Sequence, residues 1–264
     1  MGGNYILKIN NLCNLNCCFC ADPIETRLLS DFPYEKLIKG LKEKKEKFEN
    51  LIITGGEPTI YPQLIPLLKY AKEECGYKQI FLTTNGVMLH LQANADKLIH
   101  AGVDTFLISF PCSDEAMYDA IVKKKGSFRL AVEGIKNVKR RGKQVRVNTA
   151  MHKLNYRYLP KTIPFLAELG VDAIQLSFLN PIGSSMVNGK SAIALSYTQI
   201  MPTIDEAFIE AKKIGYEGLY IENIPACIAS KYIPYLSDFR KPDENKDYYN
   251  ASKAKPSQCS SCSM

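Results

Sequence analysis

The chain alternates between short apolar runs and longer amphipathic segments. Six runs rich in apolar and β-branched residues have the character of buried parallel strands: Tyr5–Asn11, Leu51–Thr54, Gln79–Thr84, Thr105–Phe110, Val145–Ala150 and Ala173–Phe178. The segments between and after them have the apolar period of helices, near residues 34–47, 62–76, 90–101, 127–142, 157–169 and 198–214. Several helical segments close on a glycine that suits a helix end, as at Gly102, Gly142 and Gly170.

Strands separated by helices predict one architecture. Six βα units in a row require crossover connections of one hand, which produce a parallel sheet. We predict an α/β fold in which this sheet curls into a partial (β/α)6 TIM-like barrel over residues 1–215, followed by a short cysteine-bearing extension over residues 216–264. Function in such sheets lies at the carboxyl ends of the strands. That rim collects the cysteine-rich segment after the first strand, together with Gly55–Pro58, Thr84–Gly86, Ser109, Asn148 and Asn180–Pro181.

Composition narrows the possibilities. The 264 residues are 46% apolar and 23% charged, which is typical of a globular protein and not of a disordered one. No apolar run could span a bilayer and no signal peptide precedes the first strand, so we expect a cytoplasmic protein without a membrane partner. In that compartment the nine cysteines are expected to be ligands or reduced core residues. The net charge of +7 comes partly from Lys123–Lys125 and Lys139–Arg141, which we interpret as solvated helix faces rather than a nucleic-acid site.

Residues 13–20, CNLNCCFC, concentrate four cysteines in one segment. The spacing of Cys13, Cys17 and Cys20 lets one loop offer three thiolates to a cubic iron–sulfur cluster. Three ligands leave one iron open for a substrate or cofactor, whereas a purely structural site would use a fourth cysteine. A zinc loop is the alternative for the triplet alone, although zinc motifs usually come as paired CxxC units.

This spacing, with the aromatic Phe19 before the last cysteine, resembles the signature of the radical S-adenosylmethionine (radical SAM) superfamily. The sequence GGEP, at Gly55, Gly56, Glu57 and Pro58, resembles the second motif of that superfamily. The resemblance implies that the backbone after the second strand, helped by the glutamate, holds the amino group of SAM. Glycine permits such a close approach. Taken alone, the same four residues would indicate a plain strand-to-helix turn.

The stretch from Phe106 to Gly142 also resembles the fourth βα unit of superfamily members that carry C-terminal clusters. By that likeness Ser109 would contact the SAM ribose, and Asn148 would lie near the methionine carboxylate or the ribose. Thr84 and Asn85, after the third strand, are included among the expected cofactor-binding residues. Without the resemblance, Ser109 and Asn148 are equally compatible with polar caps at strand ends.

The resemblance implies an enzyme in which a reduced [4Fe–4S] cluster cleaves SAM to a 5′-deoxyadenosyl radical, which abstracts hydrogen from an unactivated carbon. The expected partners are a small-molecule substrate, with anionic metabolites among the options, and an external electron donor such as flavodoxin or ferredoxin. A peptide-modifying maturase is the runner-up, because such enzymes often carry an N-terminal leader-binding domain and here the first strand begins within five residues of Met1. The alternative of another class is a non-enzymatic module in which zinc or iron fastens a barrel that binds nucleic acid or protein.

Three further cysteines, Cys227, Cys259 and Cys262, lie near the end of the sequence. Their arrangement resembles the short twitch-type extension of some superfamily members and implies an auxiliary [4Fe–4S] cluster. Relatives with full ligation usually offer another cysteine after such a CxxC, whereas this sequence ends at Ser263 and Met264. Three alternatives follow for the auxiliary cluster. One of its irons is open, or another residue supplies the fourth ligand, or the chain has been shortened. A buried Cys227 beside a zinc-type CxxC is the remaining alternative.

The other cysteines and the histidines carry weaker expectations. Cys18 is expected to point away from the cluster, and Cys75 is expected to be a core or surface thiol. Cys112 lies two residues beyond the fourth strand, where it is a candidate ligand, hydrogen donor or plain loop residue. The histidines show no metal spacing, and only His152, just past the fifth strand, is placed to face the pocket.

Overall fold

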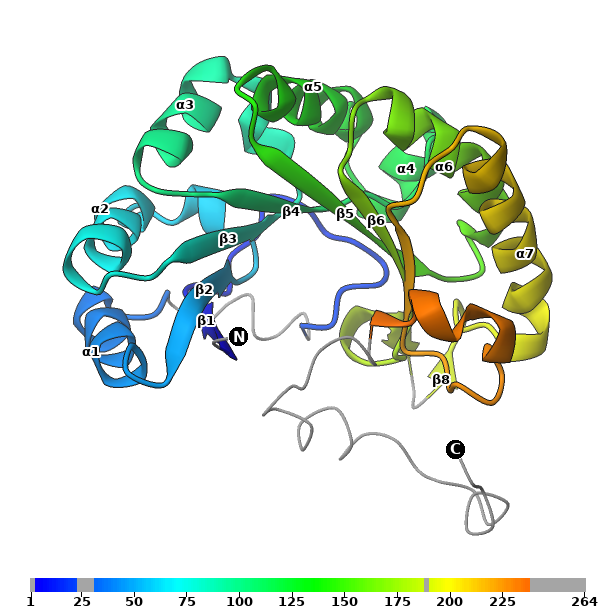
Figure 1. The fold of residues 1–264 in the computed structure, drawn as a ribbon, viewed down its shortest axis with the longest axis horizontal. Coiled ribbons are helices and arrows are strands. Elements are labelled where there is room, and N and C mark those ends of the chain that lie inside the picture. Colours follow the sequence, from blue (N-terminus) through cyan, green and yellow to red (C-terminus); the bar gives the residue numbers. More distant parts are fainter. Residues whose placement is uncertain (1–2, 23–30, 188–189, 238–264) are drawn as a thin grey trace, which may run out of the picture.

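The structure is a computed structural model, and it describes residues 3–22, 31–187 and 190–237. Its main sheet has seven parallel strands in the order β1-β2-β3-β4-β5-β6-β9. The sheet curls into an arc with helices along its outer side, which confirms the predicted α/β partial barrel (Figure 1). The strands are β1 (Gly3–Lys8), β2 (Phe48–Thr54), β3 (Gln79–Thr84), β4 (Thr105–Ser109), β5 (Gln144–Met151), β6 (Ala173–Phe178) and β9 (Leu219–Glu222).

Helices connect successive strands. The α-helices are α1 (Tyr34–Lys44), α2 (Leu64–Lys69), α3 (Gln92–His100), α4 (Glu115–Val122), α5 (Ser127–Arg140), α6 (Leu159–Glu168) and α7 (Tyr197–Lys213). Helix α2 continues as a π-helical turn, η3 (Tyr70–Glu74). Short 3-10 turns are η2 (Pro58–Ile60), η4 (Val87–His90), η5 (Tyr156–Tyr158), η6 (Gly183–Ser185) and η7 (Ser230–Tyr235), and β7 (Met186–Val187) pairs with β8 (Lys190–Ser191) in a small hairpin.

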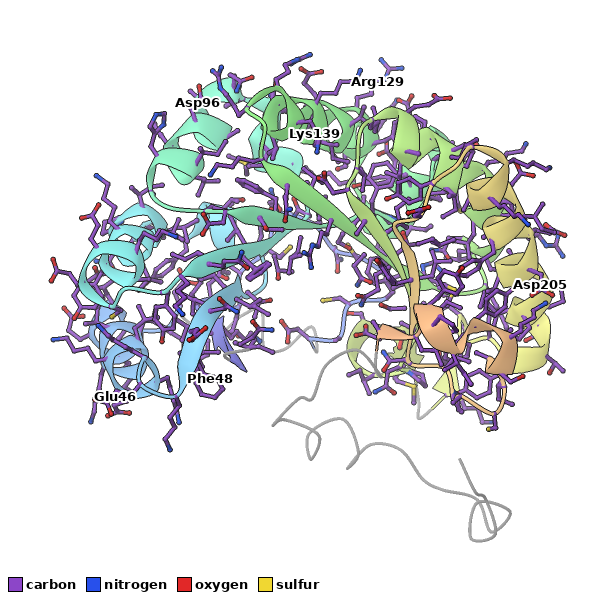
Figure 2. All side chains as sticks on the ribbon, viewed as in Figure 1. Glu46, Phe48, Asp96, Arg129, Lys139 and Asp205 are labelled. Carbon is purple, nitrogen blue, oxygen red and sulfur yellow. The ribbon has the colours of Figure 1, made fainter. Side chains whose placement is uncertain are left out.

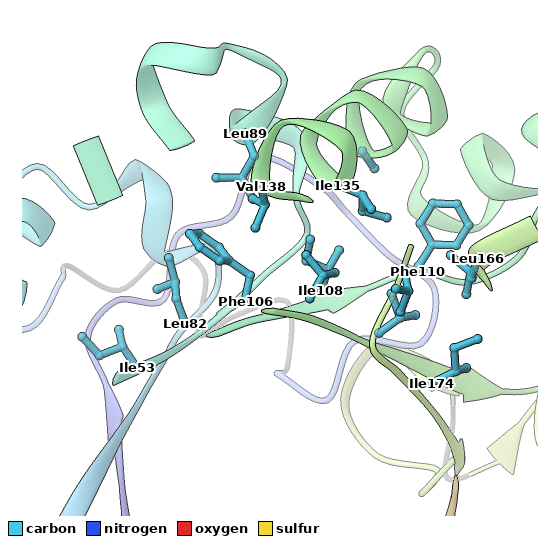
Figure 3. Packing of buried hydrophobic residues seen from close by; sticks show 14 of the residues in the cluster. Ile53, Leu82, Leu89, Phe106, Ile108, Phe110, Ile135, Val138, Leu166 and Ile174 are labelled. Carbon is cyan, nitrogen blue, oxygen red and sulfur yellow. The ribbon is translucent and has the colours of Figure 1, made fainter. Parts of the chain in front are cut away.

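Alternate residues of each strand face the helices. On β5, Val147 is buried whereas Arg146 and Asn148 are exposed. Because successive side chains of a strand point to opposite faces, the buried set packs under the helices and the other set lines the concave side. Figure 3 shows part of the buried set, with Ile108 of β4 facing Val138 of α5. Each fully buried aliphatic side chain of this kind contributes about 1.5–3 kcal/mol to stability.

Helix α4 and strand β9 were not predicted, and neither was the small hairpin of β7 and β8. Helix α4 lies directly after the fourth strand unit and is separated from α5 by only residues 123–126, so its short apolar period merges with that of α5. Strand β9 pairs in parallel with β6 and extends the sheet beyond the six strands expected. Its four residues are too few for a periodic signal. The division of the chain at residue 215 stays a prediction, and β9 lies on its C-terminal side.

The basic run at the end of α5 is confirmed as a solvated helix face. Each of its three cations has an acidic partner: Lys139 with Asp172 (2.7 Å), Arg140 with Glu133 (2.7 Å) and Arg141 with Asp96 (2.6 Å). Figure 2 labels Asp96 on the outer side of α3. Surface pairs of this kind contribute little to stability. Within the described ranges, no helix is both long and apolar enough to cross a membrane.

Candidate active site

The cysteine-rich segment is a loop that follows β1. Residues 9–22 contain no helix or strand, and Figure 1 shows them, in blue, running inside the arc of the sheet. The start of the loop is held by the turn after β2. Gly56 N donates to Asn10 O at 3.0 Å, and Glu57 N donates to Leu12 O at 2.8 Å. The predicted second motif therefore holds the cysteine loop through its own backbone.

The rest of the loop is held by other elements of the rim. Two backbone N–H groups of the loop donate to carbonyl oxygens in the last turn of α4. The segment after β6 donates an N–H to the end of the loop. Lysine 124, from the other basic run, donates its Nζ to Asn14 O at 3.1 Å. The backbone bonds are Asn16 N to Val122 O (3.1 Å), Cys18 N to Ile121 O (3.0 Å) and Ser184 N to Cys20 O (2.8 Å). The loop thus spans the carboxyl ends of several strand units.

The side chains of Cys13, Cys17, Cys18 and Cys20 are all partly buried. The sulfur of Cys13 accepts a hydrogen bond from Leu15 N at 3.4 Å. Burial raises the pKa of the Cys18 thiol, which disfavours a thiolate there. The expectation that Cys18 is not a ligand stays a prediction.

Both glycines of the GGEP turn are needed for its contact with the loop. A Cβ at Gly55 would lie 2.0 Å from Asn10 Oδ1, and a Cβ at Gly56 would lie 2.2 Å from Leu12 O. Any larger residue would push the loop away, because only glycine lets two backbones approach this closely. The glycines expected to admit SAM therefore also serve the packing of the cysteine loop.

Glu57 is completely buried. Its carboxylate accepts hydrogen bonds from Thr59 N (3.1 Å), Thr84 Oγ1 (2.6 Å) and Asn85 N (2.7 Å). Burial raises the pKa of Glu57, and these donors, which favour the anion, oppose that shift. The side chain of Glu57 thus positions the turn from within, by tying it to the end of β3. Pro58, which begins η2, is buried beside it.

Asn85 joins the turn after β3 to the cysteine loop. Its Nδ2 donates to Asn14 Oδ1 at 2.7 Å and lies 3.9 Å from Cys13 Sγ. Its Oδ1 accepts from Val87 N at 3.0 Å. Thr84 and Asn85, expected to bind cofactor, are brought together with the GGEP turn and the first cysteine, and both make protein contacts that fix this arrangement.

Ser109 and Asn148 are neighbours in register on the concave face of the sheet. Asn148 continues into a polar network that the sequence did not predict. Ser177 Oγ lies 2.6 Å from Asn148 Oδ1 and 3.0 Å from Glu222 Oε2, and Gln175 Nε2 donates to the same glutamate oxygen at 2.6 Å. Alternation along β6 could have placed Gln175 and Ser177 on this face, but Glu222 belongs to the unpredicted strand β9.

The remaining candidates are Cys112 and the three C-terminal cysteines. Cys112 is buried, its Sγ donates to Asp114 O at 3.7 Å, and burial raises its pKa to about 12. It is a protonated thiol in the core, and its role stays a prediction. Cys227 is exposed, and Cys259 and Cys262 lie outside the described residues, so the auxiliary site stays a prediction.

Residues 7–166 match the family model of the radical SAM superfamily. The chain belongs to the radical SAM superfamily. Members of this superfamily are enzymes that use SAM and a [4Fe–4S] cluster, so the predicted enzyme class and these two cofactors are confirmed at the level of the family.

Two relatives illustrate the range of activities around this radical SAM chain. It is 29% identical over 189 residues to the "Probable GTP 3',8-cyclase" of Sulfurisphaera tokodaii, covering 67% of this chain and 56% of the relative. It is 26% identical over 203 residues to the "PqqA peptide cyclase" of Bradyrhizobium diazoefficiens, covering 75% of this chain and 50% of the relative. The chain spans about half the length of these relatives.

Solved structures share the fold. Streptococcus suis SuiB bound to S-adenosylmethionine has a TM-score of 0.67 at 20% identity, covering 90% of this chain and 54% of that chain. Methylornithine synthase has a TM-score of 0.63 at 17% identity, covering 84% of this chain and 64% of that chain. At these identities the likeness shows the fold alone.

The cysteine loop has the donor type that an iron–sulfur cluster needs, because Cys13, Cys17 and Cys20 are thiol side chains on one loop. In the part of the chain that the structure describes, no three His, Cys, Asp or Glu side chains form a group that could hold one ion. A cubic cluster has another requirement, because each thiolate binds a different iron at its own corner. Cys13, Cys17 and Cys20 lie at separate positions along one loop, and hydrogen bonds fix the backbone between them.

Proposed function

We propose that this radical SAM enzyme binds its [4Fe–4S] cluster through Cys13, Cys17 and Cys20 and abstracts a hydrogen atom from a small-molecule substrate. The observation that carries the proposal is the clamped cysteine loop. Its backbone is hydrogen-bonded to the turn after β2, to the end of α4 and to the segment after β6. This supports a rigid three-thiol site at the carboxyl rim, where parallel sheets place their chemistry.

When bound, the reduced cluster and SAM supply a 5′-deoxyadenosyl radical, and the protein supplies position and shelter. We assign the backbone of Gly55, Gly56 and Pro58 to the amino group of SAM, with Glu57 holding that turn from inside. Buried Glu57 has no need to move for this role, because its hydrogen bonds are already made within the protein. A preformed turn orients a ligand without a cost of reorganisation.

The polar concave face supports roles for Ser109 and Asn148 in holding the ribose and carboxylate of SAM. Asn148 is fixed by Ser177, so its amide is held in one orientation. Thr84 and Asn85 position the rim, because they connect Glu57 to the cysteine loop.

The concave face also supports a polar substrate with an anionic group. Arg146 lies on this face with its guanidinium 5.8 Å from the centre of the Phe81 ring. No ion pair of Arg146 is found among the described residues. A cation held against an aromatic ring without an acidic partner is suited to a carboxylate or phosphate of a small molecule.

A peptide substrate is the second candidate. One relative is a peptide cyclase by name, and SuiB bound to the precursor peptide SuiA shares the fold with a TM-score of 0.71 at 18% identity, covering 87% of this chain and 51% of that chain. Stimulation of SAM cleavage by small metabolites or by peptides separates the two. An external electron donor such as flavodoxin or ferredoxin is the expected reductant for either.

We extend the proposal to an auxiliary cluster in residues 216–264, with Cys227, Cys259 and Cys262 as ligands. Its support is the cysteine triplet and the exposure of Cys227. Anaerobically reconstituted protein should then contain iron and sulfide for two clusters. Iron for one cluster, with zinc in the second site, would contradict the auxiliary cluster and leave the first proposal intact.

The central test is chromatography of SAM-derived products after dithionite reduction. Slow formation of 5′-deoxyadenosine is expected without substrate, and faster formation with the right metabolite, because substrate binding closes the site to water. Alanine at Cys13, Cys17 or Cys20 should abolish it, whereas Cys18→Ala is the matched control and should change little. Clustered, SAM-binding protein that yields no 5′-deoxyadenosine would contradict hydrogen abstraction, and S-adenosylhomocysteine would indicate methyl transfer.

A further inference from the structure

Two buried hydrogen-bond donors without partners border the cysteine loop. Within the described residues, the hydroxyl of Tyr118 and Nε2 of His152 have no hydrogen-bond partner, and both side chains are fully closed to solvent. Buried polar groups are almost always satisfied, since an unsatisfied one loses its bonds to water without replacement. Such an atom beside a ligand site indicates a missing acceptor.

Tyr118 lies on the helix that holds the middle of the loop. Its ring packs against Phe110 (4.9 Å between centroids) and Phe128 (5.5 Å), which fixes the phenol. Residues three and four positions later, Ile121 and Val122, accept the loop N–H groups. Burial, and after it the negative charge that Cys17 carries as a thiolate, raises the pKa of Tyr118, so the hydroxyl keeps its proton.

His152 approaches the loop from the end of β5. Its ring stacks on Phe19, between the second and third ligand cysteines, with 5.5 Å between centroids and 27° between planes. Nδ1 accepts from Leu154 N at 3.3 Å, so the proton of the neutral ring lies on Nε2. Burial lowers the pKa of His152 to about 4, which keeps the ring neutral. Nε2–H is therefore a donor with a fixed direction beside the loop.

Both orphan groups are donors, and thiolates and sulfides are the acceptors that the cysteine loop would bring. We propose that Tyr118 and His152 donate hydrogen bonds to sulfur atoms of the cluster held by Cys13, Cys17 and Cys20, and thereby raise its reduction potential; this inference rests on the proposed function. Hydrogen bonds to sulfur stabilise the more negative, reduced cluster, and they are one of the means by which proteins set cluster potentials.

Tyr118→Phe and His152→Phe test this, because each keeps an aromatic ring and removes the donor. The matched control is Tyr77→Phe, since Tyr77 is also a buried tyrosine but its hydroxyl donates to Leu41 O of α1 at 3.0 Å. The measurement is a redox titration of reconstituted protein without SAM, followed by electron paramagnetic resonance of the reduced N-terminal cluster. Tyr118→Phe and His152→Phe should each need a more negative potential for half-reduction of the cluster, and the double variant should need the most negative. Tyr77→Phe should titrate like the wild type.

Cluster-free protein gives an independent readout. Tyr118→Phe should not lower its thermal midpoint, because the hydroxyl has no partner to lose, whereas Tyr77→Phe should lower it by removing the hydrogen bond between the hydroxyl and Leu41 O. Fully clustered variants with the wild-type potential would overturn the inference and leave the proposed function standing. A shift that occurs only with SAM bound would also overturn it, by assigning the donors to SAM. Wild-type protein that holds no cluster on this loop would instead sink the proposed function.

Discussion

The backbone N–H of Asn85 donates a 2.7 Å hydrogen bond to the buried carboxylate of Glu57, and this bond joins the turn after β2 to the turn after β3. Each of the two turns also contacts the cysteine loop. Glu57 N donates to Leu12 O, and the Asn85 side chain donates to Asn14. The position of the cysteines therefore depends on a glutamate whose carboxylate is bound to other residues of the rim.

Replacing Glu57 by glutamine, a side chain of nearly the same size, should destabilise the protein. The amide keeps one acceptor oxygen, but its NH2 group faces donors such as Asn85 N–H, so a buried donor loses its partner. We expect a loss of about 2–3 kcal/mol, or roughly 5–10 °C in the thermal midpoint of cluster-free protein. Glu49→Gln is the control, because Glu49 is an exposed partner of Lys78 and should change stability by less than about 1 kcal/mol. Equal midpoints for the two variants would refute the positioning role.

Replacing Asn85 by aspartate should weaken retention of the cluster. The new carboxylate would stand where Nδ2 lies 3.9 Å from Cys13 Sγ, and its repulsion of a thiolate at that distance is about 1–4 kcal/mol, depending on exposure to water. Iron per protein after gel filtration should fall. Asn50→Asp makes the same change at the opposite end of the sheet, where Asn50 contacts Asn4, and should retain iron normally. Wild-type iron content in Asn85→Asp would contradict this view of the rim.

Local signals predicted the parts of the site that are close together in the sequence. The spacing of Cys13, Cys17 and Cys20 and the turn at Gly55–Pro58 are short motifs, and each strand that precedes them has a clear apolar pattern. Their mutual contact followed from one rule, that the carboxyl ends of parallel strands share a rim. The bonds between loop and turn agree with that expectation.

What could not be predicted depends on tertiary contacts. A glutamate such as Glu57 is expected to be solvated, and only the folded rim shows four donors converging on it. Strand β9 owes its existence to pairing with β6, because four residues carry little propensity of their own. Tyr118 and His152 have ordinary sequence contexts, and their missing partners become evident only after every neighbouring group has been placed.

The cysteine loop should also be sensitive to Gly183, at the start of η6. Gly183 has a φ of +58°, and a Cβ there would lie 2.3 Å from Ala21 O and 2.4 Å from Cys20 O. Gly183→Ala should therefore displace the end of the loop and lower iron content. Gly142→Ala is the matched control, because Gly142 has a φ of +68° but no atom within 4 Å of its added Cβ. Both variants should lose about 1 kcal/mol to backbone strain, and only Gly183→Ala should lose iron; equal iron contents would contradict the clamp.

His152 should make the stability of the cluster-free protein depend on pH. Its pKa is lowered to about 4 in the folded state because burial disfavours the charged ring, whereas an unfolded histidine has a pKa of about 6.5. Between these values the unfolded chain binds a proton that the folded chain does not, so the unfolding free energy falls as the pH drops through this window. The contribution of His152 is complete above pH 6.5 and decreases by about 3 kcal/mol toward pH 4.

The comparison that isolates this effect is between wild type and His152→Phe, by urea unfolding at pH 4.5, 5.5 and 7.5. The phenylalanine side chain cannot bind a proton, so the variant lacks the loss of unfolding free energy that His152 causes at low pH. The unfolding free energy of the variant minus that of the wild type should therefore increase as the pH falls, and it should be constant above pH 7. His100→Phe serves as the control, because it makes the same substitution at an exposed residue, whose Nδ1 contacts Asp96 O. A pH-independent difference for His152→Phe would mean that the ring accepts a proton in the folded protein, and it would also remove the argument that Nε2–H is held as a neutral donor beside the cysteine loop.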